Sequence, residues 1–381
     1  MSNQMDVKRF DEWLKDDSPV AAITLRQWLE PIEGKDAVIF PPTFAKPERT
    51  RDEDWVGYNI DYFPDGTNVC LIDSVGAQAN RMEPLFMRDA YKELVPQVQV
   101  TFEKKDGKET VKKTVNLLEA GHRIADAAIR FSDLAPAIKE TLVALRERGD
   151  SEPLVKLAPT SVVFGAWDSR DTQVKLPRIV RSTIRAFNVK VLHRSAQYNP
   201  ALDYVDEGVF ENKDQAEALS ELGFNHAPAA WTHGGVLATG GIRRDALVNL
   251  AALRRFHVPD DKDQERTMKL RRYLLGLSLV ALTAPQETSL REGGELVADS
   301  DRPAEWNAVE HSGKRTKADV AHKTVKTFAE AAARAFGVGA DKQATFDTKK
   351  AREEAGKSKQ ERKKKGGKTD KASDDAEQTE V

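Results

Sequence analysis

The chain has 381 residues, 59 of them Lys or Arg and 61 Asp or Glu, so its formal net charge is −2. A hydrophobic fraction of 40 % allows a sizeable core, which excludes collagen-like and wholly disordered proteins. One cysteine, Cys70, excludes a disulfide within the chain and a multi-cysteine zinc site. No apolar run reaches the roughly 20 residues of a membrane span, and the first residues lack the apolar core of a signal peptide. We therefore expect a cytoplasmic protein.

The predicted elements of the first half alternate between strands and helices. A short amphipathic helix is predicted over 5–15 and a strand over 20–32, followed by a long irregular excursion over 40–66. Further along, the pattern predicts a strand over 68–73, a helix over 77–94, a hairpin over 98–118, a helix over 124–148 and a buried strand over 161–167.

The second half continues this irregular alternation. A helix is predicted over 175–188 with Pro177 in its first turn, then strands over 189–193 and 236–239. Helices are predicted over 245–256, capped by Asp245, and over 266–282 and 316–336. Strands and helices are interleaved too irregularly for a doubly wound sheet, so the predicted class is α+β.

The last segment, 341–381, differs from the body of the chain. It contains 12 basic and 10 acidic residues and one aromatic residue, Phe346. Such a composition cannot bury enough apolar surface to offset the entropy of ordering the chain. We expect a body over 1–340 and a disordered tail over 341–381. The basic run in the tail could bind nucleic acid, but a charged run of this kind is more often simply solvated.

A basic segment, 175–194, is the most unusual stretch of the body. It holds no acidic residue and six basic ones: Lys175, Arg178, Arg181, Arg185, Lys190 and Arg194. On a helix, the three arginines at 178, 181 and 185 would share one face. Guanidinium groups match phosphate oxygens and stay charged, so an unbalanced row favours a phosphate chain as ligand. The alternative is a solvated helix that pairs with carboxylates from elsewhere in the body.

Two further segments have features of anion sites. After the strand that ends at Asp73, a turn with small residues opens a helix with four polar candidates: Ser74, Gln78, Asn80 and Arg81. Free N–H groups at a helix start attract anions, although an ordinary capped connection would look the same. In the second segment, two Gly-Gly pairs precede Arg243 and Arg244 without matching a phosphate loop.

Signals for an enzyme are weak. The seven histidines form no HExxH pattern, no GxSxG is present, and His226 and His233 do not form a recognised ligand set. We therefore expect no metal, no cofactor and no catalytic residue. Asp73 is the one carboxylate beside a possible phosphate site, and Trp167 and Trp231 are candidates for base stacking, or otherwise core residues.

Five segments in fixed order resemble one family. They read CLIDSVGAQANRMEP, LAPTSVVFGAWDS, KLPRIVRSTIRA, GGVLATGGIRRDAL and LREGGELV, and the likeness extends over about residues 32–297. This order resembles the backbone subunit of type I CRISPR surveillance complexes, subtype I-U or I-G, of the RAMP superfamily.

The resemblance implies a modified RNA-recognition (ferredoxin-like) palm with insertions, approximately 35–66 and 199–230, either of which could be a finger or thumb. It also implies a non-catalytic protein that lines up in several copies on a CRISPR guide RNA. Its partners would be that RNA, target DNA through the guide, copies of itself and other effector subunits. The expected RNA contacts are Ser74, Gln78, Asn80, Arg81, Lys175, Arg178, Arg181, Arg185, Arg194, Arg243 and Arg244.

Two other functions remain open at this point. One is a ribonuclease of the same superfamily, with Asp73 and His193 as the residues to suspect. The other is a structural protein whose basic segment binds an acidic protein and no RNA. The sequence lacks an aromatic RNP signature, so binding of bases across the sheet in the usual way is not expected.

Overall fold

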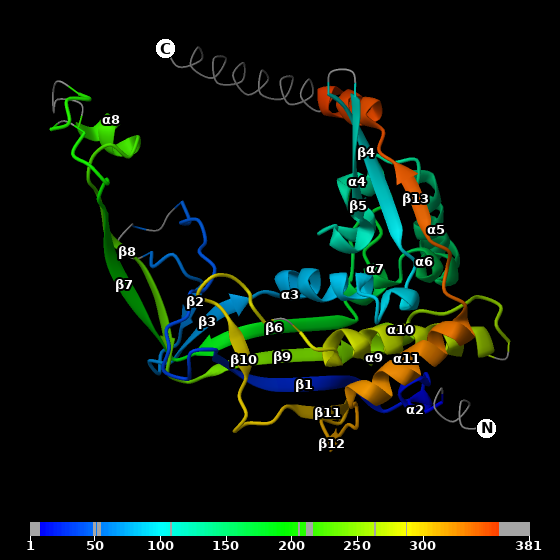
Figure 1. Ribbon diagram of the computed structural model, residues 1–381. Helices are drawn as coiled ribbons and strands as arrows, with labels where there is room; N and C mark the ends of the chain where they lie inside the picture. The colour runs from blue at the N-terminus through cyan, green and yellow to red at the C-terminus, as the bar shows by residue number, and fades with distance from the viewer. Residues whose placement is uncertain are drawn as a thin grey trace, which may run out of the picture.

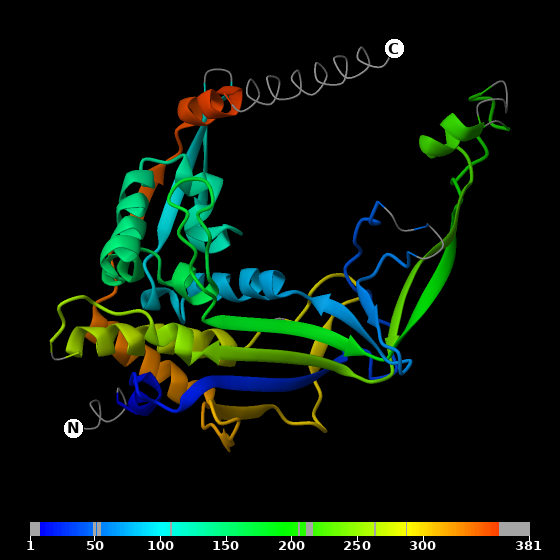
Figure 2. The same cartoon turned by 180° about the vertical axis from the view of Figure 1, so that it is seen from behind.

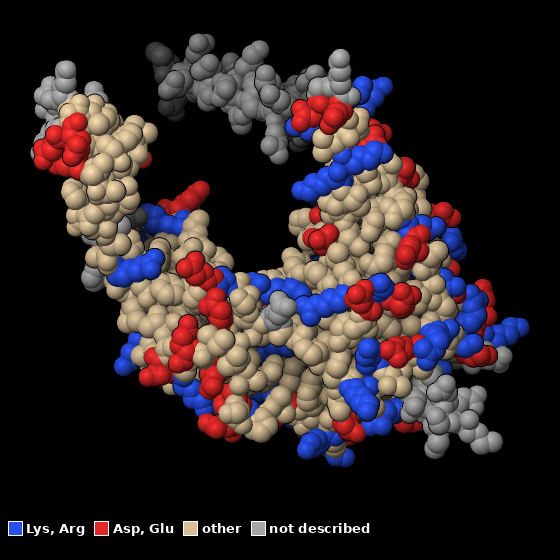
Figure 3. Space-filling model, in the orientation of Figure 1, with Lys and Arg blue, Asp and Glu red and all other residues tan. Residues whose placement is uncertain are grey.

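A computed structural model describes residues 8–48, 51, 55–106, 109–204, 206–210, 216–262, 264–286 and 288–357. The molecule has a base, formed by its largest sheet and the helices packed on it, and two projecting arms (Figure 1). One arm is a long strand pair, here called the hairpin arm, and the other, the helical arm, combines a small sheet with several helices (Figure 2). The surface is hollowed between them (Figure 3).

The sheet of the base is antiparallel throughout. Its strands are β1 (Val20–Pro31), β2 (Ile60–Tyr62), β3 (Asn68–Asp73), β6 (Val180–Phe187), β9 (Ile242–Asn249), β10 (Leu296–Ala298), β11 (Glu305–Glu310) and β12 (Arg315–Lys317). Their order is β12-β11-β1-β9-β6-β3-β2, with β10 on the end of β1.

Four strands at the centre of this sheet have a familiar connectivity. In space they run β11-β1-β9-β6, and helices connect β1 to β6 and β9 to β11. This is the fourth-first-third-second order of a ferredoxin-like βαββαβ unit. The α+β class is therefore confirmed. The RNA-recognition palm stays a prediction, which this strand order supports.

Helices cover one face of the sheet. They are α2 (Asp11–Leu14), α3 (Val75–Met82), α9 (Leu250–Arg254), α10 (Glu265–Thr283) and α11 (His322–Phe336), with 3-10 turns η2 (Glu83–Met87) and η3 (Lys92–Leu94). Gly276 lets α10 and α11 pack closely, because an added Cβ would lie 2.9 Å from the Ala329 Cα. In the described chain no helix has both the length and the apolar character needed to cross a membrane.

The hairpin arm consists of β7 (Val189–Tyr198) and β8 (Ala227–Ala238), with α8 (Ala216–Glu221) near its tip. The predicted strands over 189–193 and 236–239 are confirmed, and both are longer than predicted. The described residues of the connection 199–226, part of one predicted insertion, lie at the far end of this arm (Figure 1).

The helical arm is built by the segment between α3 and β6, joined by residues near the end of the described chain. It contains β4 (Val98–Asp106), β5 (Glu109–Asn116), η4 (Leu117–Glu119), η5 (Arg123–Ala125), α4 (Ala127–Arg130), α5 (Ala135–Arg148), α6 (Glu152–Leu157), α7 (Pro159–Phe164) and β13 (Lys342–Thr345). The predicted hairpin is confirmed as β4 and β5.

The boundary of the expected disordered tail is wrong. Strand β13 pairs in parallel with β4, and residues 348–357 are helical. Phe346 stacks on Phe102 with ring centres 4.5 Å apart, so one aromatic side chain anchors a polar segment. Residues 358–381, which contain most of the basic run, lie outside the described chain.

Two predicted elements have the opposite type. The expected strand over 161–167 is largely helix α7, which begins at Pro159 and is buried on all sides. The expected helix over 175–188 is largely strand β6, in which Arg181 is exposed and Arg185 half-buried while Ser182, Thr183 and Ile184 between them are buried. A short apolar run does not distinguish a buried helix from a buried strand, and Pro177 simply precedes the strand.

Other boundaries also differ. The helix predicted over 245–256 is the second half of β9 followed by α9, and its cap is Asn249, whose Oδ1 accepts from the Ala252 N–H at 2.9 Å. Helix α3 ends at Met82, just before Pro84, and α11 starts only at His322, after β12. The predictions for β1, β3 and α10 are confirmed.

Candidate nucleic-acid interface

A groove with basic walls lies at the foot of the helical arm. Three segments line it, 121–125, 165–170 and 175–178, and we call it the basic groove. Four of its residues are permanently charged cations, Arg123, Arg170, Lys175 and Arg178, and none of its described residues is acidic. A concave surface with one sign of charge concentrates ligands of the opposite sign. The basic groove is therefore suited to a polyanion.

A tight turn after α7 shapes the wall of this groove. Gly165 has φ +77°, and an added Cβ would lie 2.8 Å from Cγ of Arg178, so a side chain cannot fit there without displacement. Arg178 donates from Nη1 to the carbonyl of Phe164 at 3.2 Å. The chain then returns through a backbone hydrogen bond from Leu176 to Ala166. Arg178 is thereby fixed at the groove without a carboxylate partner in the described chain.

An exposed aromatic ring lies beside these cations. Trp167 is 58 % exposed, and Nζ of Lys175 lies 5.7 Å from the centre of its ring. No ion pair joins Lys175 or Arg170 to a carboxylate of the described residues. Aromatic rings and cations together bind single-stranded nucleic acid, because bases stack on the ring and phosphates meet the charge.

A buried ion pair lies beneath the basic groove. Nε of Arg123 lies 2.7 Å from Oε2 of Glu83, and both side chains are almost fully buried. Burial raises the pKa of Glu83 to about 7, opposed by the nearby Arg123 charge. Arg123 also donates to the carbonyl of Gly165 and to Oδ1 of Asn80, each at 3.3 Å. It therefore connects α3 to both sides of the groove.

The polar side chains at the start of α3 form hydrogen bonds with other groups of the same chain. Oγ of Ser74 caps the helix by accepting from the Ala77 N–H at 3.2 Å. Gln78 is buried and donates from Nε2 to Oδ2 of Asp73 at 2.7 Å. Asn80 and Arg81 are the more exposed members of the predicted set. The helix start does not leave its side-chain groups free to receive an anion.

Asp73 is enclosed by this network. Nε of Arg81 lies 3.1 Å from its Oδ2, and Nη2 of Arg291 lies 3.8 Å from its Oδ1. With Gln78 as a further donor, the buried carboxylate has partners on both oxygens. It is a structural anchor between β3 and the loop that holds Arg291. Burial also raises the pKa of the Cys70 thiol to about 12, which makes that thiol inert at neutral pH.

The three arginines predicted from the sequence to share one helical face lie on two different surfaces in the fold. Arg181 and Arg185 lie on the face of β6 opposite Ser182, which hydrogen-bonds to Gln78 of α3. They line a second concave surface on the open face of the sheet. Arg178 precedes the strand and belongs to the basic groove. A shared helical face for all three arginines is therefore wrong.

The paired arginines of β9 point to opposite faces of the sheet. Arg243 lies over the rings of Trp28 and Phe187 and donates to Asp245 at 2.9 Å. Arg244 is buried and donates from Nε to Oγ of Ser182 at 2.9 Å, and burial lowers its pKa to about 10. Burial therefore argues against a direct contact of RNA with Arg244, as it does for Gln78.

The remaining candidates lie at the hairpin arm. Arg194 is exposed, with its guanidinium 5.5 Å from the centre of the Phe40 ring. His226 contacts Asn199 at 2.8 Å, and His233 packs against Tyr58. The side chain of Trp231 lies outside the described residues. Across the described chain, no three His, Cys, Asp or Glu residues are grouped closely enough to hold a metal.

Sequence reasoning missed half of the basic groove. His122, Arg123 and Arg170 lie far from the basic segment in the chain, and no local cluster marks them. Only the return of the chain after α7 brings them beside Lys175 and Arg178.

The architecture is thus an antiparallel α+β base with a basic groove at the foot of one arm, and the charge of that groove is of the sign that suits a polyanion. Residues 23–191 match the family model of the CRISPR-associated protein GSU0053. The match places residues 23–191 in this CRISPR-associated family, and the matched region contains most of β1 and the whole basic groove. No curated protein matches the chain.

Proposed function

We propose that the chain is a non-catalytic backbone subunit that binds CRISPR guide RNA and assembles in several copies along it. The observation that carries this proposal is the basic groove, in which Trp167 is exposed and Arg170, Lys175 and Arg178 have no described carboxylate partner, whereas Arg123 is buried against Glu83. These groups hold phosphate and stack bases without reading sequence. Sequence would then be read by pairing of the guide with target DNA.

The arms fit the same function. The groove adjoins α3, which lies on the base between the two arms (Figure 1). An RNA in the groove would pass through the hollow that Figure 3 shows. The segment 199–226, whose described residues lie at the tip of the hairpin arm, is rich in acidic residues, and we assign it the contact with a neighbouring copy. Other copies and further effector subunits are the partners we propose.

Binding of a 30-nucleotide RNA to the full chain across a salt series tests the proposal. Replacing Arg170 and Lys175 with Ala should weaken binding and flatten the salt dependence, by about 0.7 in the log–log slope for each lost contact. The matched control replaces Lys317 and Lys323, which are exposed on the base and have no described ion pair.

Equal slopes for both variants would remove the groove as the RNA site. Failure of the unmodified chain to bind RNA would favour the structural protein that binds an acidic partner. Cleavage of the RNA during the experiment would favour the ribonuclease alternative, although the partners of Asp73 do not leave its carboxylate free for that role.

A further inference from the structure

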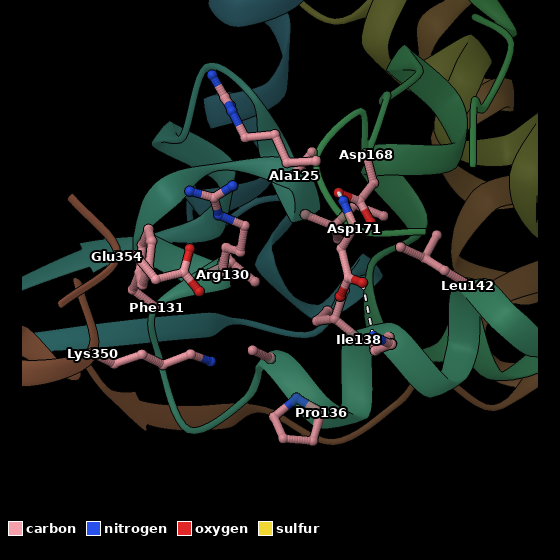
Figure 4. A pocket seen from close by; sticks show the side chains of 15 residues that line it. Ala125, Arg130, Phe131, Pro136, Ile138, Leu142, Asp168, Asp171, Lys350 and Glu354 are labelled. Atoms are coloured by element: carbon pink, nitrogen blue, oxygen red, sulfur yellow. Dashed lines mark hydrogen bonds and ion pairs between the residues drawn. The ribbon is translucent and has the colours of Figure 1, made fainter. Parts of the chain in front are cut away.

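Two cavities of the molecule differ in how their charges are balanced. Figure 4 shows the cavity of the helical arm, whose lining includes both acidic and basic side chains. Asp171 there pairs with Lys139 at 2.8 Å, and Asp168 accepts from the Thr172 N–H and hydroxyl at 2.8 and 2.7 Å. Because charges of both signs share this cavity, it does not call for a counter-ion from outside.

The second cavity, in the base, lies between the sheet, the end of α10 and the start of α11. Its volume is about 470 Å³, within the range of sites for small organic ligands. None of its described lining residues is acidic, and Arg244 is the one permanent cation among them, so we call it the Arg244 cavity. His322 also lines it, but burial lowers the pKa of the imidazole, which is therefore neutral near pH 7.

Arg244 lines this cavity with its charge uncompensated. Arg244 is only 3 % exposed, Nε donates to Oγ of Ser182 at 2.9 Å, and Nη2 lies 3.4 Å from the sulfur of Met82, a weak acceptor. Among the described residues, Nη1 has no hydrogen-bond partner and the guanidinium has no ion pair. Burial lowers the pKa of Arg244 to about 10, so the group is still charged at neutral pH. A buried charge costs free energy unless it is paired, and the cavity therefore favours an anion.

The hydrogen bonds of Arg244 lead to a carboxylate that already has other partners. Ser182 donates from Oγ to Oε1 of Gln78 at 2.8 Å, and Gln78 donates to Asp73 at 2.7 Å. Two residues thus separate Asp73 from Arg244, and two other arginines share the charge of Asp73. The described chain therefore supplies no carboxylate to Arg244.

The rest of the lining suits a ligand with an apolar body. Leu25, Leu29 and Leu282 line the cavity and are buried. Gln27 is the partner of Arg244 in the register of β1 and β9, and its side chain has no hydrogen bond with a described residue. Its amide can therefore donate to a second oxygen of a carboxylate held by Arg244.

We propose that the Arg244 cavity binds an organic carboxylate with an apolar body. The two oxygens of a carboxylate match the parallel N–H groups of a guanidinium, and the leucines enclose the body of the ligand. One buried cation balances one negative charge, so a singly charged carboxylate fits better than a chain of phosphates. This inference goes beyond the proposed function, because neither the RNA nor the basic groove takes part in it. The carboxylate belongs to a free organic acid or to an acidic side chain of a neighbouring protein, and the experiment separates these sources.

Titration of the full chain with 4-fluorobenzoate, followed by fluorine NMR, tests this site. The matched probe is 4-fluorobenzamide, which has the same ring and no charge. Arg244→Met removes the guanidinium and keeps an unbranched side chain, and Arg243→Met is its control on the opposite face of the same strand. Ala298→Trp places a ring at an exposed position of the lining. Its control is Ala251→Trp, on an exposed position of α9 that does not line the cavity.

We expect the unmodified chain to bind the acid about tenfold more tightly than the amide. Arg244→Met and Ala298→Trp should each weaken binding of the acid about tenfold, and the two control variants should not change it. Glu287, between two lining residues in the chain, lies outside the described residues. Glu287→Gln should also leave binding of the acid unchanged.

The small molecules released when the chain is purified from its own host and denatured identify the source of the carboxylate. An organic acid recovered from the unmodified chain, and not from Arg244→Met, indicates a free ligand. Binding of the probe without any recovered acid indicates an acidic side chain of a neighbouring protein. Either result supports a carboxylate as the occupant of the cavity.

Absence of acid binding, equal binding of the acid and the amide, or acid binding that survives Arg244→Met would overturn the proposal. So would acid binding seen only in Glu287→Gln, because the chain would then supply its own carboxylate. Unfolding midpoints of the variants identify a folding defect, and retention of acid binding by Ala298→Trp overturns the proposal if Arg244→Met does not fold. RNA binding by the unmodified chain is measured separately, so the proposed function does not depend on these results.

Discussion

Glu83 and Arg123 form a buried ion pair between the turn that follows α3 and η5, with Nε of Arg123 2.7 Å from Oε2 of Glu83. The pair is not fully compensated, because Oε1 of Glu83 has no hydrogen-bond partner. Arg123 also has φ +54°, an uncommon backbone conformation for a residue other than glycine. The buried ion pair and the uncommon backbone conformation of Arg123 both cost free energy, and both lie directly beneath the basic groove. Together they fix the position of the groove relative to α3.

The first prediction concerns the pH dependence of stability. Burial raises the pKa of Glu83 from 4.5 to about 7, so the folded state binds more protons than the unfolded state between these values. The contribution of Glu83 to the free energy of unfolding should therefore fall as pH rises from about 4.5 to 7, by about 1.4 kcal/mol for each unit of pKa difference.

Glu83→Gln should remove this part of the pH dependence, and it leaves Arg123 without a carboxylate only at pH values near or above 7, where Glu83 is ionised. Urea unfolding between pH 5 and 8 measures the effect, with Glu140→Gln on the exposed face of α5 as control. The same slope against pH in Glu83→Gln and the unmodified chain would contradict the prediction.

The second prediction concerns Asp73. Asp73→Ala removes the common partner of Gln78, Arg81 and Arg291, and we expect a loss of about 3 kcal/mol in the free energy of unfolding. Denaturant unfolding measures it, with Asp61→Ala on exposed β2 as control. A loss of RNA cleavage with stability unchanged would instead identify a catalytic aspartate.

The third prediction concerns the turn at Gly165. In Gly165→Ala, a residue with a side chain must adopt a positive φ, and its Cβ would lie 2.8 Å from Cγ of Arg178. We expect the free energy of unfolding to fall by about 2–3 kcal/mol and RNA binding to weaken. Gly313 also has a positive φ, but its Cβ would meet nothing within 4 Å. Gly313→Ala should cost about 1 kcal/mol and leave RNA binding unchanged. Equal costs would show that the close approach to Arg178 is unimportant.

The fourth prediction separates the two basic surfaces. Arg181 and Arg185 line a surface on the open face of the sheet that shares no lining residue with the basic groove. Replacing both with Ala should therefore leave the salt slope of RNA binding unchanged, whereas the Arg170 and Lys175 variant flattens it. A salt series measured side by side decides this, and a flatter slope for the Arg181 and Arg185 variant would move the RNA path to the open face.

Much of the strand framework could be predicted from local pattern. β1, β3 and the β4–β5 hairpin follow from β-branched and apolar residues bounded by turn residues. The prediction failed at β6, where arginines at three- and four-residue spacing imitated a helix. Its real signal is the alternation of Val180, Ser182 and Ile184 with Arg181 and Arg185, which is visible only once one face is known to be buried.

The amino-acid sequence by itself determined the α+β class, six of the thirteen described strands, the presence of an unbalanced basic segment and the order of segments that resembles a CRISPR-associated family. The tertiary structure alone decided which cations share a surface. It placed Arg123 and Arg170 beside Lys175, buried Arg244 and Gln78, and turned Arg181 to the other face. The reason is physical: local residue types set the backbone pattern, but packing between segments far apart in the chain decides which charges remain in contact with solvent.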